Sequence, residues 1–421
     1  MKKSILFFIL IFAITIANSQ APGKATIINA PESHGFSSER LHNITKGVKS
    51  ILKHEETPGG VVAIVRKGEL IYTNTFGYQD LKKKIPMDFN SIFRIYSMTK
   101  PITSVATMQL WEQGLIKLDD PIHLYIPEFE HMKVAIENED KSKIIKMVSM
   151  ERPITIQDLL RHTSGLTYGK FGPKTAVRKE WIKSEHKFRS FTSADFIKEI
   201  TKLPLIGQPG KRWEYSYSTD VLGRLIEVVS GQELGDYFKE HIFTPLGMND
   251  TGFYIPKEKL HRAAQGHNFK TNDYPTNFID VAKKPKMSAG GGGLTSTISD
   301  YIIFTKMLLN NGSYNGKHLL GRKTVETMTA NHMPLDIDKG DLFLPGDGHG
   351  FGLGFAVRLE KGMAATPGSK DDFRWGGWAG TGFWIDPAEE MISIFMVQDP
   401  KSSAYLRDRY KALVYQALIN E

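Results

Sequence analysis

The stretch FRIYSMTKPITS, residues 93–104, decides how the rest of the chain is interpreted. It joins an apolar strand-like run to a run with helical spacing, and it places Ser97 and Lys100 three residues apart at the junction. Residues three apart on a helix share a face, so the two side chains should point the same way. Two interpretations follow: a nucleophile with its base, or an N-cap serine with a solvated lysine one turn on.

Spacing alone does not separate these interpretations, because Ser50/Lys53 and Ser184/Lys187 have the same spacing. The first pair lies near the end of an expected helix, and the second lies in a polar, basic segment. Only Ser97 stands between a strand and a helix.

Pro101 adds a backbone argument. Proline has no N–H and collides with the carbonyl four residues earlier, which belongs to Ser97. The regular helix should therefore begin just after Ser97 and leave the N–H of that serine unpaired. A free N–H at the positive end of a helix is what an oxyanion hole requires.

A second candidate, Tyr215, lies in PGKRWEYSYSTDVLG, residues 209–223, in a turn just before a helix. A phenol there can project into a cleft, but it ionises near pH 10 and needs a nearby cation such as Lys100 to act as a base. The alternative is a half-buried aromatic residue beside Trp213 and Tyr217.

A third candidate is RWGGWAGTGFWIDP, residues 374–387. Two adjacent glycines in a strand, Gly376 and Gly377, indicate close approach of a ligand to the backbone. A bulge or a bend of the sheet is the alternative.

The order of apolar patterns predicts an α+β fold. A helix over residues 37–53 precedes two β-branched runs joined at Lys67-Gly68, which predict a hairpin. Three strand-like runs and an amphipathic helix close the chain. We expect one antiparallel sheet built from both chain ends (about 37–95 and 288–421), flanked by helices, with a helical, loop-rich region (about 96–287) inserted between them.

The first residues, MKKSILFFILIFAITIANSQ, predict a cleavable signal peptide over residues 1–19, followed by a single domain over 20–421. The apolar run is shorter than the ~20 residues that span a bilayer, so no stable membrane anchor is expected. The protein should be secreted or periplasmic. The absence of cysteine excludes disulfides, thiolate metal sites and a cysteine nucleophile.

The sequence lacks the motifs of several other functional classes. The formal net charge is +8, and the densest basic segment, residues 170–189, contains no nucleic-acid-binding motif, so we expect no nucleic-acid partner. The thirteen histidines show no metal-ligand spacing, and we expect neither metal nor cofactor. No G-x-S-x-G occurs, which argues against an α/β-hydrolase. We assign His162 a structural hydrogen bond.

Taken in order, YSMTK, YSYSTDVLG and WGG resemble the three motifs of the serine β-lactamase and penicillin-binding-protein family. The resemblance is closest to the class C β-lactamase branch, which includes the family VIII carboxylesterases, and it covers nearly all of the mature chain. HTSGL at 162–166 and SAGGGGLTST at 288–297 are also similar to segments of this branch.

The resemblance implies a β-lactamase/transpeptidase-like fold and a role for each motif. Ser97 would be the acylated nucleophile, Lys100 the group that activates it, and Tyr215 the general base and then acid. The backbone N–H groups of Ser97 and Trp378 would form the oxyanion hole.

Two departures from the family pattern bear on the substrate. Trp375, Gly376 and Gly377 replace Lys-Thr-Gly, and Tyr217 replaces the asparagine of Tyr-x-Asn. Both changes exchange polar recognition for aromatic surface, so we expect these four residues to bind an uncharged substrate. Arg374 does not restore the cation, because neighbouring side chains in a strand point to opposite faces.

We therefore expect an exported serine hydrolase that cleaves small ester or amide substrates through an acyl-enzyme. The alternatives are a β-lactamase, a D-amino-acid peptidase or acyltransferase on the same scaffold, and a β-lactam-binding sensor without turnover. The sequence leaves the oligomeric state open.

Overall fold

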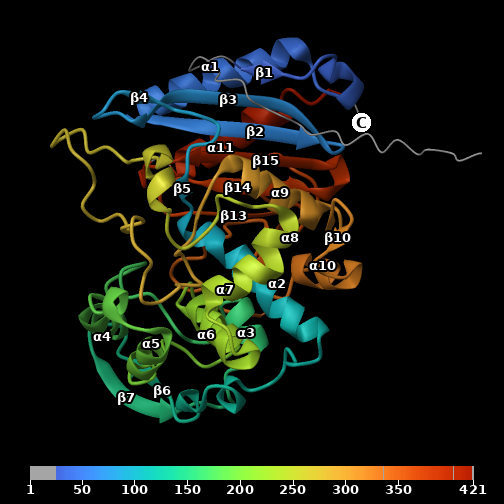
Figure 1. Ribbon diagram of the computed structural model, residues 1–421. Coiled ribbons are helices and arrows are strands. Elements are labelled where there is room, and N and C mark those ends of the chain that lie inside the picture. The colour runs from blue at the N-terminus through green and yellow to red at the C-terminus, as the bar shows by residue number, and fades with distance from the viewer. Residues whose placement is uncertain (1–24, 335, 402, 420–421) are drawn as a thin grey trace, which may run out of the picture.

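The computed structural model describes residues 25–334, 336–401 and 403–419; the predicted signal peptide lies outside them. Within these residues, an antiparallel sheet of nine strands forms the upper half of the molecule (Figure 1). Its order is β1-β3-β2-β15-β14-β13-β12-β11, with β4 paired to β3. The strands are β1 (Thr26–Ile27), β2 (Gly59–Arg66), β3 (Glu69–Asp80), β4 (Ile85–Pro86), β11 (His349–Phe351), β12 (Ala356–Arg358), β13 (Phe373–Gly376), β14 (Gly382–Asp386) and β15 (Met391–Val397).

The predicted early hairpin is confirmed as β2–β3. Its turn residues, Lys67 and Gly68, have φ values of 48° and 80°, the left-handed pair that matches the twist of a two-residue hairpin. β2 pairs with β15 along its length, with Val62 opposite Phe395. The sheet is thus built from both chain ends, as expected.

The prediction of three late strands is wrong in number, because the described part of this region contains five, β11 to β15. The first two apolar runs each fold as a hairpin rather than as one strand. The chain reverses at Gly354 and Gly380, whose φ values of 104° and 92° lie in the region open to glycine.

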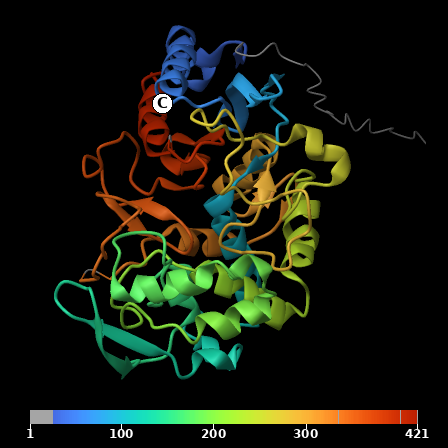
Figure 2. The ribbon, with the colours of Figure 1, turned by 90° about the vertical axis from the view of Figure 1, so that its left-hand side faces the viewer.

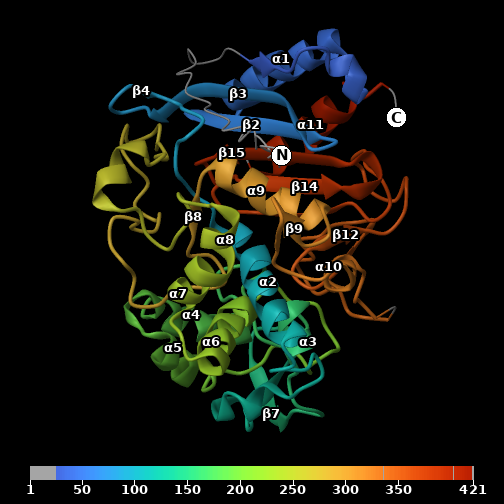
Figure 3. The ribbon, with the colours of Figure 1, turned by 45° about the vertical axis from the view of Figure 1, so that its right-hand side comes forward.

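Helices cover both faces of the sheet (Figures 1 and 3). The predicted terminal helices, α1 (Ser38–His54) and α11 (Ser403–Tyr415), pack together on the outer face. α9 (Ile298–Leu309) lies on the inner face, against β15 and β2. Two short sheets, β5 (Phe93–Arg94) with β8 (Thr295–Ser296) and β9 (Ser313–Tyr314) with β10 (Lys317–His318), and the helix α10 (Arg322–Thr329) complete this half.

The inserted region is mainly helical and lies below the sheet (Figures 1 and 2). It contains α3 (Ile156–Leu160), α4 (Ala176–Glu185), α5 (Ser193–Ile200), α6 (Ser218–Ser230), α7 (Leu234–Phe238) and α8 (Thr244–Leu246). It also contains the hairpin β6–β7 (Lys133–Glu137 and Ile144–Ser149), which the sequence did not predict. No helix of the described residues is long and apolar enough to cross a membrane.

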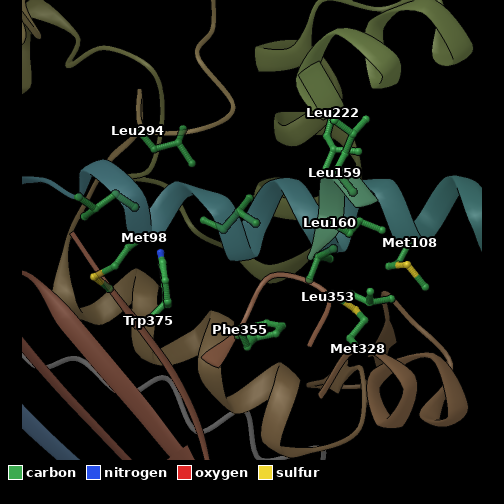
Figure 4. Packing of buried hydrophobic residues seen from close by; sticks show 14 of the residues in the cluster. Met98, Met108, Leu159, Leu160, Leu222, Leu294, Met328, Leu353, Phe355 and Trp375 are labelled. Atoms are coloured by element: carbon green, nitrogen blue, oxygen red, sulfur yellow. The ribbon is translucent and has the colours of Figure 1, made fainter. Parts of the chain in front are cut away.

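The helix α2 (Thr99–Glu112) runs from the sheet into the helical region. Its residues 99–110 are all buried, so other elements surround it on every side (Figure 4). Met98 and Trp375 pack at its start, and Leu159 and Leu222 pack farther along. α2 therefore holds the FRIYSMTK stretch between the two halves of the molecule.

Candidate active site

Ser97 lies in one turn of 3-10 helix, Tyr96–Met98, directly before α2. The expected helix start is confirmed, since α2 begins at Thr99. Tyr96 has a φ of 42°, which bends the chain sharply before the serine. The N–H of Ser97 donates to no described residue, and the side chain is half-buried. The serine thus combines an accessible hydroxyl with a free backbone donor.

Lys100 is 1% exposed and points back at Ser97. Its Nζ donates to the carbonyl oxygen of Gly291 at 2.6 Å and to the hydroxyl of Tyr168 at 3.1 Å, and it lies 3.5 Å from Oγ of Ser97. Ser97 caps no helix, since α2 begins without a side-chain cap. The alternative of an N-cap serine with a solvated lysine is therefore wrong.

The position of Gly291 is set by Asp220. Oδ1 of Asp220 accepts a hydrogen bond from the N–H of Gly291 at 3.0 Å, and a Cβ at Gly291 would collide with the same carboxylate. Burial raises the pKa of Asp220, while the Lys100 charge acts in the opposite direction. The glycine-rich stretch therefore serves to bring a backbone carbonyl against the buried lysine.

Two tyrosines contact Lys100, and the sequence pointed to only one of them. The ammonium nitrogen lies 4.6 Å from the ring centroid of Tyr215, whereas the hydroxyl that it binds belongs to Tyr168. Tyr168 lies two residues after HTSGL, and this position was the only available signal. Burial, and then the charge of Asp220, raise the pKa of Tyr168 well above its usual value.

The Tyr215 hydroxyl is placed differently. It makes no hydrogen bond to a described residue, and it is not among their fully enclosed polar atoms. Its oxygen therefore borders space that solvent or a substrate can enter. The residue as a whole is only 5% exposed, so Tyr215 is more buried than the half-buried aromatic of the alternative interpretation, although its hydroxyl oxygen is not enclosed.

The WGG segment ends strand β13 and turns beside Ser97. A Cβ at Gly377 would collide with the carbonyl of Ile95, so glycine allows this turn to approach the chain just before the nucleophile. The ring of Trp378 packs edge-on against Tyr96 at 5.2 Å. The N–H of Trp378, like that of Ser97, donates to no described residue. At Gly376, a Cβ would have one close neighbour, the backbone oxygen of Thr381 at 3.2 Å.

The remaining residues expected at the substrate lie in aromatic packing. Trp375 is 5% exposed, with ring centroids 5.6 Å from Tyr215 and 5.3 Å from Phe351. Tyr217 packs 4.2 Å from Tyr168, and its hydroxyl donates to Glu185 at 3.2 Å. The side chains of Trp375 and Tyr217 therefore pack mainly against Tyr215 and Tyr168, the tyrosines at Lys100. Little of their surface is left for a substrate.

Arg374 points away from this site, as expected for the strand neighbour of Trp375. Its guanidinium donates to the carbonyl of Pro345 at 2.5 Å, and burial lowers its pKa to about 9.

His162 is 1% exposed, and its Nδ1 lies 3.1 Å from Oγ of Ser216. Burial lowers the pKa of His162 well below its usual value, so it stays neutral in a structural hydrogen bond. Among the described residues no cluster of acidic and histidine side chains could hold a metal ion.

The site thus combines a buried lysine with a serine whose backbone N–H is free, next to a sheet flanked by helices. This combination is typical of a serine hydrolase. The sequence profile of the β-lactamase family matches residues 44–417, and the chain belongs to this family. It is 32% identical to a protein of Mycobacterium tuberculosis H37Rv over 81% of this chain and 85% of that one. It is 25% identical to the esterase EstB of Burkholderia gladioli over 80% and 85% of the two chains.

A solved structure extends the similarity to the fold. EstCE1, a hydrolase with promiscuous acyltransferase activity, superposes with a TM-score of 0.72 at 26% identity, covering 90% of this chain and 100% of its own. The expected β-lactamase/transpeptidase-like fold is therefore confirmed. The protein is an enzyme of the serine-hydrolase class.

Proposed function

We propose that the protein hydrolyses ester bonds of small uncharged substrates through an acyl-enzyme on Ser97. The observation that carries this proposal is the contact of Lys100 with Oγ of Ser97 beside two unpaired backbone N–H groups. A serine needs both a proton acceptor and oxyanion donors to attack a carbonyl. The similarity to an esterase and to a hydrolase with acyltransferase activity supports the same chemistry.

In the proposed reaction, Oγ of Ser97 attacks the ester carbonyl carbon while its proton moves to the phenolate oxygen of Tyr215, whose negative charge the neighbouring Lys100 stabilises. The N–H groups of Ser97 and Trp378 bind the oxyanion. Tyr215 then protonates the departing alkoxide, and the ester C–O bond breaks. Water attacks the acyl-enzyme with Tyr215 again as base, which releases the acid and restores the serine.

The two tyrosines take different roles in this proposal. Tyr168 accepts a buried hydrogen bond from Lys100 and has a raised pKa, so it serves as a neutral phenol that orients the lysine. The Tyr215 hydroxyl borders open space and is therefore the one able to reach a substrate.

The preference for uncharged substrates rests on the charges of the WGG strand. The only arginine of the WGG strand, Arg374, donates to the carbonyl of Pro345 and interacts with charges of α11, and Trp375 stands where the family has lysine. A charge-assisted hydrogen bond contributes about 1.5 to 3 kcal/mol. A substrate carboxylate would lose that contribution from this strand.

A panel of substrates tests the proposal directly. We expect hydrolysis of p-nitrophenyl acetate and butyrate, and little or no turnover of nitrocefin or of a D-Ala-D-Ala peptide. If nitrocefin or the peptide were turned over faster than the esters, the β-lactamase or peptidase alternative would replace the esterase. Stoichiometric labelling by a β-lactam without turnover of any of these compounds would favour the sensor.

We also propose that the enzyme acts outside the cytoplasm as a soluble protein, which the predicted signal peptide over residues 1–19 supports. N-terminal sequencing of protein recovered from an exporting host should begin at about Gln20. Recovery with residues 1–19 still attached would favour a membrane-anchored form.

A further inference from the structure

The basic segment, residues 170–189, has a charged interior as well as a charged surface. Its helix α4 exposes Lys179 and Lys183 but buries Arg178, which is 1% exposed, and Glu185, which is 8% exposed. Buried charges are retained only where partners satisfy them. The partners of these two side chains lie on the loops that carry the active-site tyrosines.

Arg178 forms a buried ion pair with Glu214. Its Nη2 lies 2.6 Å from Oε1 of Glu214, and its Nη1 donates to the carbonyl of Phe171. Glu214 is 5% exposed and directly precedes Tyr215. The same carboxylate oxygen accepts a hydrogen bond from the hydroxyl of Thr167 at 2.7 Å. Thr167 directly precedes Tyr168, so one carboxylate links the chain beside both tyrosines.

Glu185 binds the other flank of Tyr168. Its Oε1 accepts a hydrogen bond from the N–H of Gly169 at 2.7 Å and another from the hydroxyl of Tyr217 at 3.2 Å. The residues before and after Tyr168 therefore each form a hydrogen bond with a buried carboxylate. One of these, Glu185, belongs to α4, and the other, Glu214, is paired with Arg178 of α4.

We infer that Glu214, held by Arg178 of α4, is a positioning residue that fixes Tyr168 and Tyr215 at Lys100. This inference rests on the proposed function, because it assigns Glu214 a task in the same proton-transfer site. Glu214 itself touches no reacting atom. Glu214 acts by holding the loop of Tyr168 and the loop of Tyr215, which are far apart in sequence, in one fixed arrangement. Small displacements of catalytic groups lower the reaction rate strongly.

The Thr167 hydroxyl allows a test that leaves the ion pair intact. Thr167→Val keeps the shape and removes the hydrogen bond to Glu214 at 2.7 Å, together with the longer contact of the same hydroxyl with the carbonyl of Tyr168 at 3.2 Å. Thr167→Ser keeps the hydroxyl. With p-nitrophenyl butyrate, we expect Thr167→Val to lower kcat about 10-fold or more with KM changed less than about 2-fold. Thr167→Ser should restore kcat to within about 2-fold of wild type.

Thr305 provides the matched control. It is fully buried, and its hydroxyl donates to the carbonyl of Tyr301 within α9, so Thr305→Val also removes one enclosed hydrogen bond. Its kcat should match wild type even if its melting temperature falls as much as that of Thr167→Val. Equal losses of kcat in the Thr167→Val and Thr305→Val variants would overturn the inference, since general destabilisation would then explain both.

A double variant covers the case in which Thr167→Val does not fold. Arg178→Met with Glu214→Gln replaces the ion pair with neutral side chains of similar size, a change that buried pairs often tolerate. Arg212, which also lies 3.5 Å from Glu214, keeps its ion pairs with Asp338 and Asp341. We expect a folded protein by circular dichroism whose kcat is lowered at least about 10-fold. A folded double variant with wild-type kcat would overturn the inference. The proposed function would still stand if Ser97→Ala were inactive in the same assay, so the two failures are distinguishable.

Discussion

Nζ of Lys100 lies 3.1 Å from the hydroxyl oxygen of Tyr168 and 4.6 Å from the ring centroid of Tyr215. The lysine therefore binds one phenol through its oxygen and the other through its π face. An ammonium group over an aromatic ring is attracted by the electron-rich face without forming a hydrogen bond to the hydroxyl. This difference leaves the hydroxyl of Tyr215 free for a substrate and commits that of Tyr168 to the lysine.

Removing each hydroxyl should therefore have different kinetic effects. Tyr215→Phe removes the proposed general base, and loss of general acid–base catalysis lowers kcat about 10²- to 10⁴-fold. Tyr168→Phe removes only a partner of Lys100, and we expect a smaller loss of about 10-fold, because Lys100 keeps its bond to Gly291. Steady-state hydrolysis of p-nitrophenyl butyrate measures both.

Tyr314 is a matched control, since it lies half-buried in the short strand β9, away from Lys100. Tyr314→Phe should hydrolyse the ester at the wild-type rate. A larger loss in Tyr168→Phe than in Tyr215→Phe would exchange the roles proposed for the two tyrosines.

Ser97→Ala should abolish ester hydrolysis and leave the protein folded, because Ser97 is half-buried and its hydroxyl forms a hydrogen bond only with Lys100 among the described residues. Intact mass spectrometry during turnover should show the acyl adduct on wild type and none on the variant. Near-wild-type turnover by Ser97→Ala would show that another residue is the nucleophile.

Gly377→Ala should damage the oxyanion hole without removing a catalytic side chain. The added Cβ would collide with the carbonyl of Ile95, so the turn carrying the Trp378 N–H must move away from Ser97. Loss of one oxyanion-hole donor lowers kcat about 10²- to 10³-fold. We expect a loss of that order in kcat, with a smaller change in KM.

Gly252→Ala serves as the control for this substitution. Its added Cβ would meet only a carbonyl oxygen at 3.6 Å, an ordinary contact. Its kcat should equal that of wild type. If Gly377→Ala also kept its kcat, Trp378 would not be an oxyanion donor.

The features that the sequence predicted correctly are those set by local patterns. The Lys67-Gly68 turn follows from Gly68, which accepts a left-handed backbone, and the start of α2 follows from the missing N–H of Pro101. β6 and β7 were missed because β6 has only three apolar residues between two charged ends, while Lys146 interrupts the apolar run of β7, which is mostly exposed.

The parts of the site that escaped prediction depend on tertiary contacts. Tyr168 reaches Lys100 from 68 positions away, and Asp220 reaches Gly291 from 71. No periodicity or local motif encodes such a distance, and a single tyrosine or aspartate has many structural uses. Their roles emerge only once α2 is enclosed by both halves of the molecule.

The stability of the protein should depend on pH through Asp300 in the first turn of α9. The side chain is 6% exposed and accepts hydrogen bonds from the N–H of Asp250 and the hydroxyl of Thr251, both at 2.8 Å. Burial raises its pKa from 3.8 to about 6. Between these values the folded protein binds more protons than the unfolded chain, so this group lowers the free energy of unfolding as pH rises from about 4 to 6.

Asp300→Asn should remove this dependence, because the amide stays neutral and its oxygen still accepts a hydrogen bond. Relative to the variant, the free energy of unfolding of wild type should fall by up to about 3 kcal/mol between pH 4 and 6 and change little above pH 6.

Asp195 serves as the control. It occupies the same position in α5, but a hydrogen bond from Thr192 lowers its pKa. Wild type should therefore gain stability relative to Asp195→Asn as pH rises through about 4. Urea unfolding at several pH values measures both differences, and slopes of the same sign for the two variants would contradict the assignment of a raised pKa to Asp300.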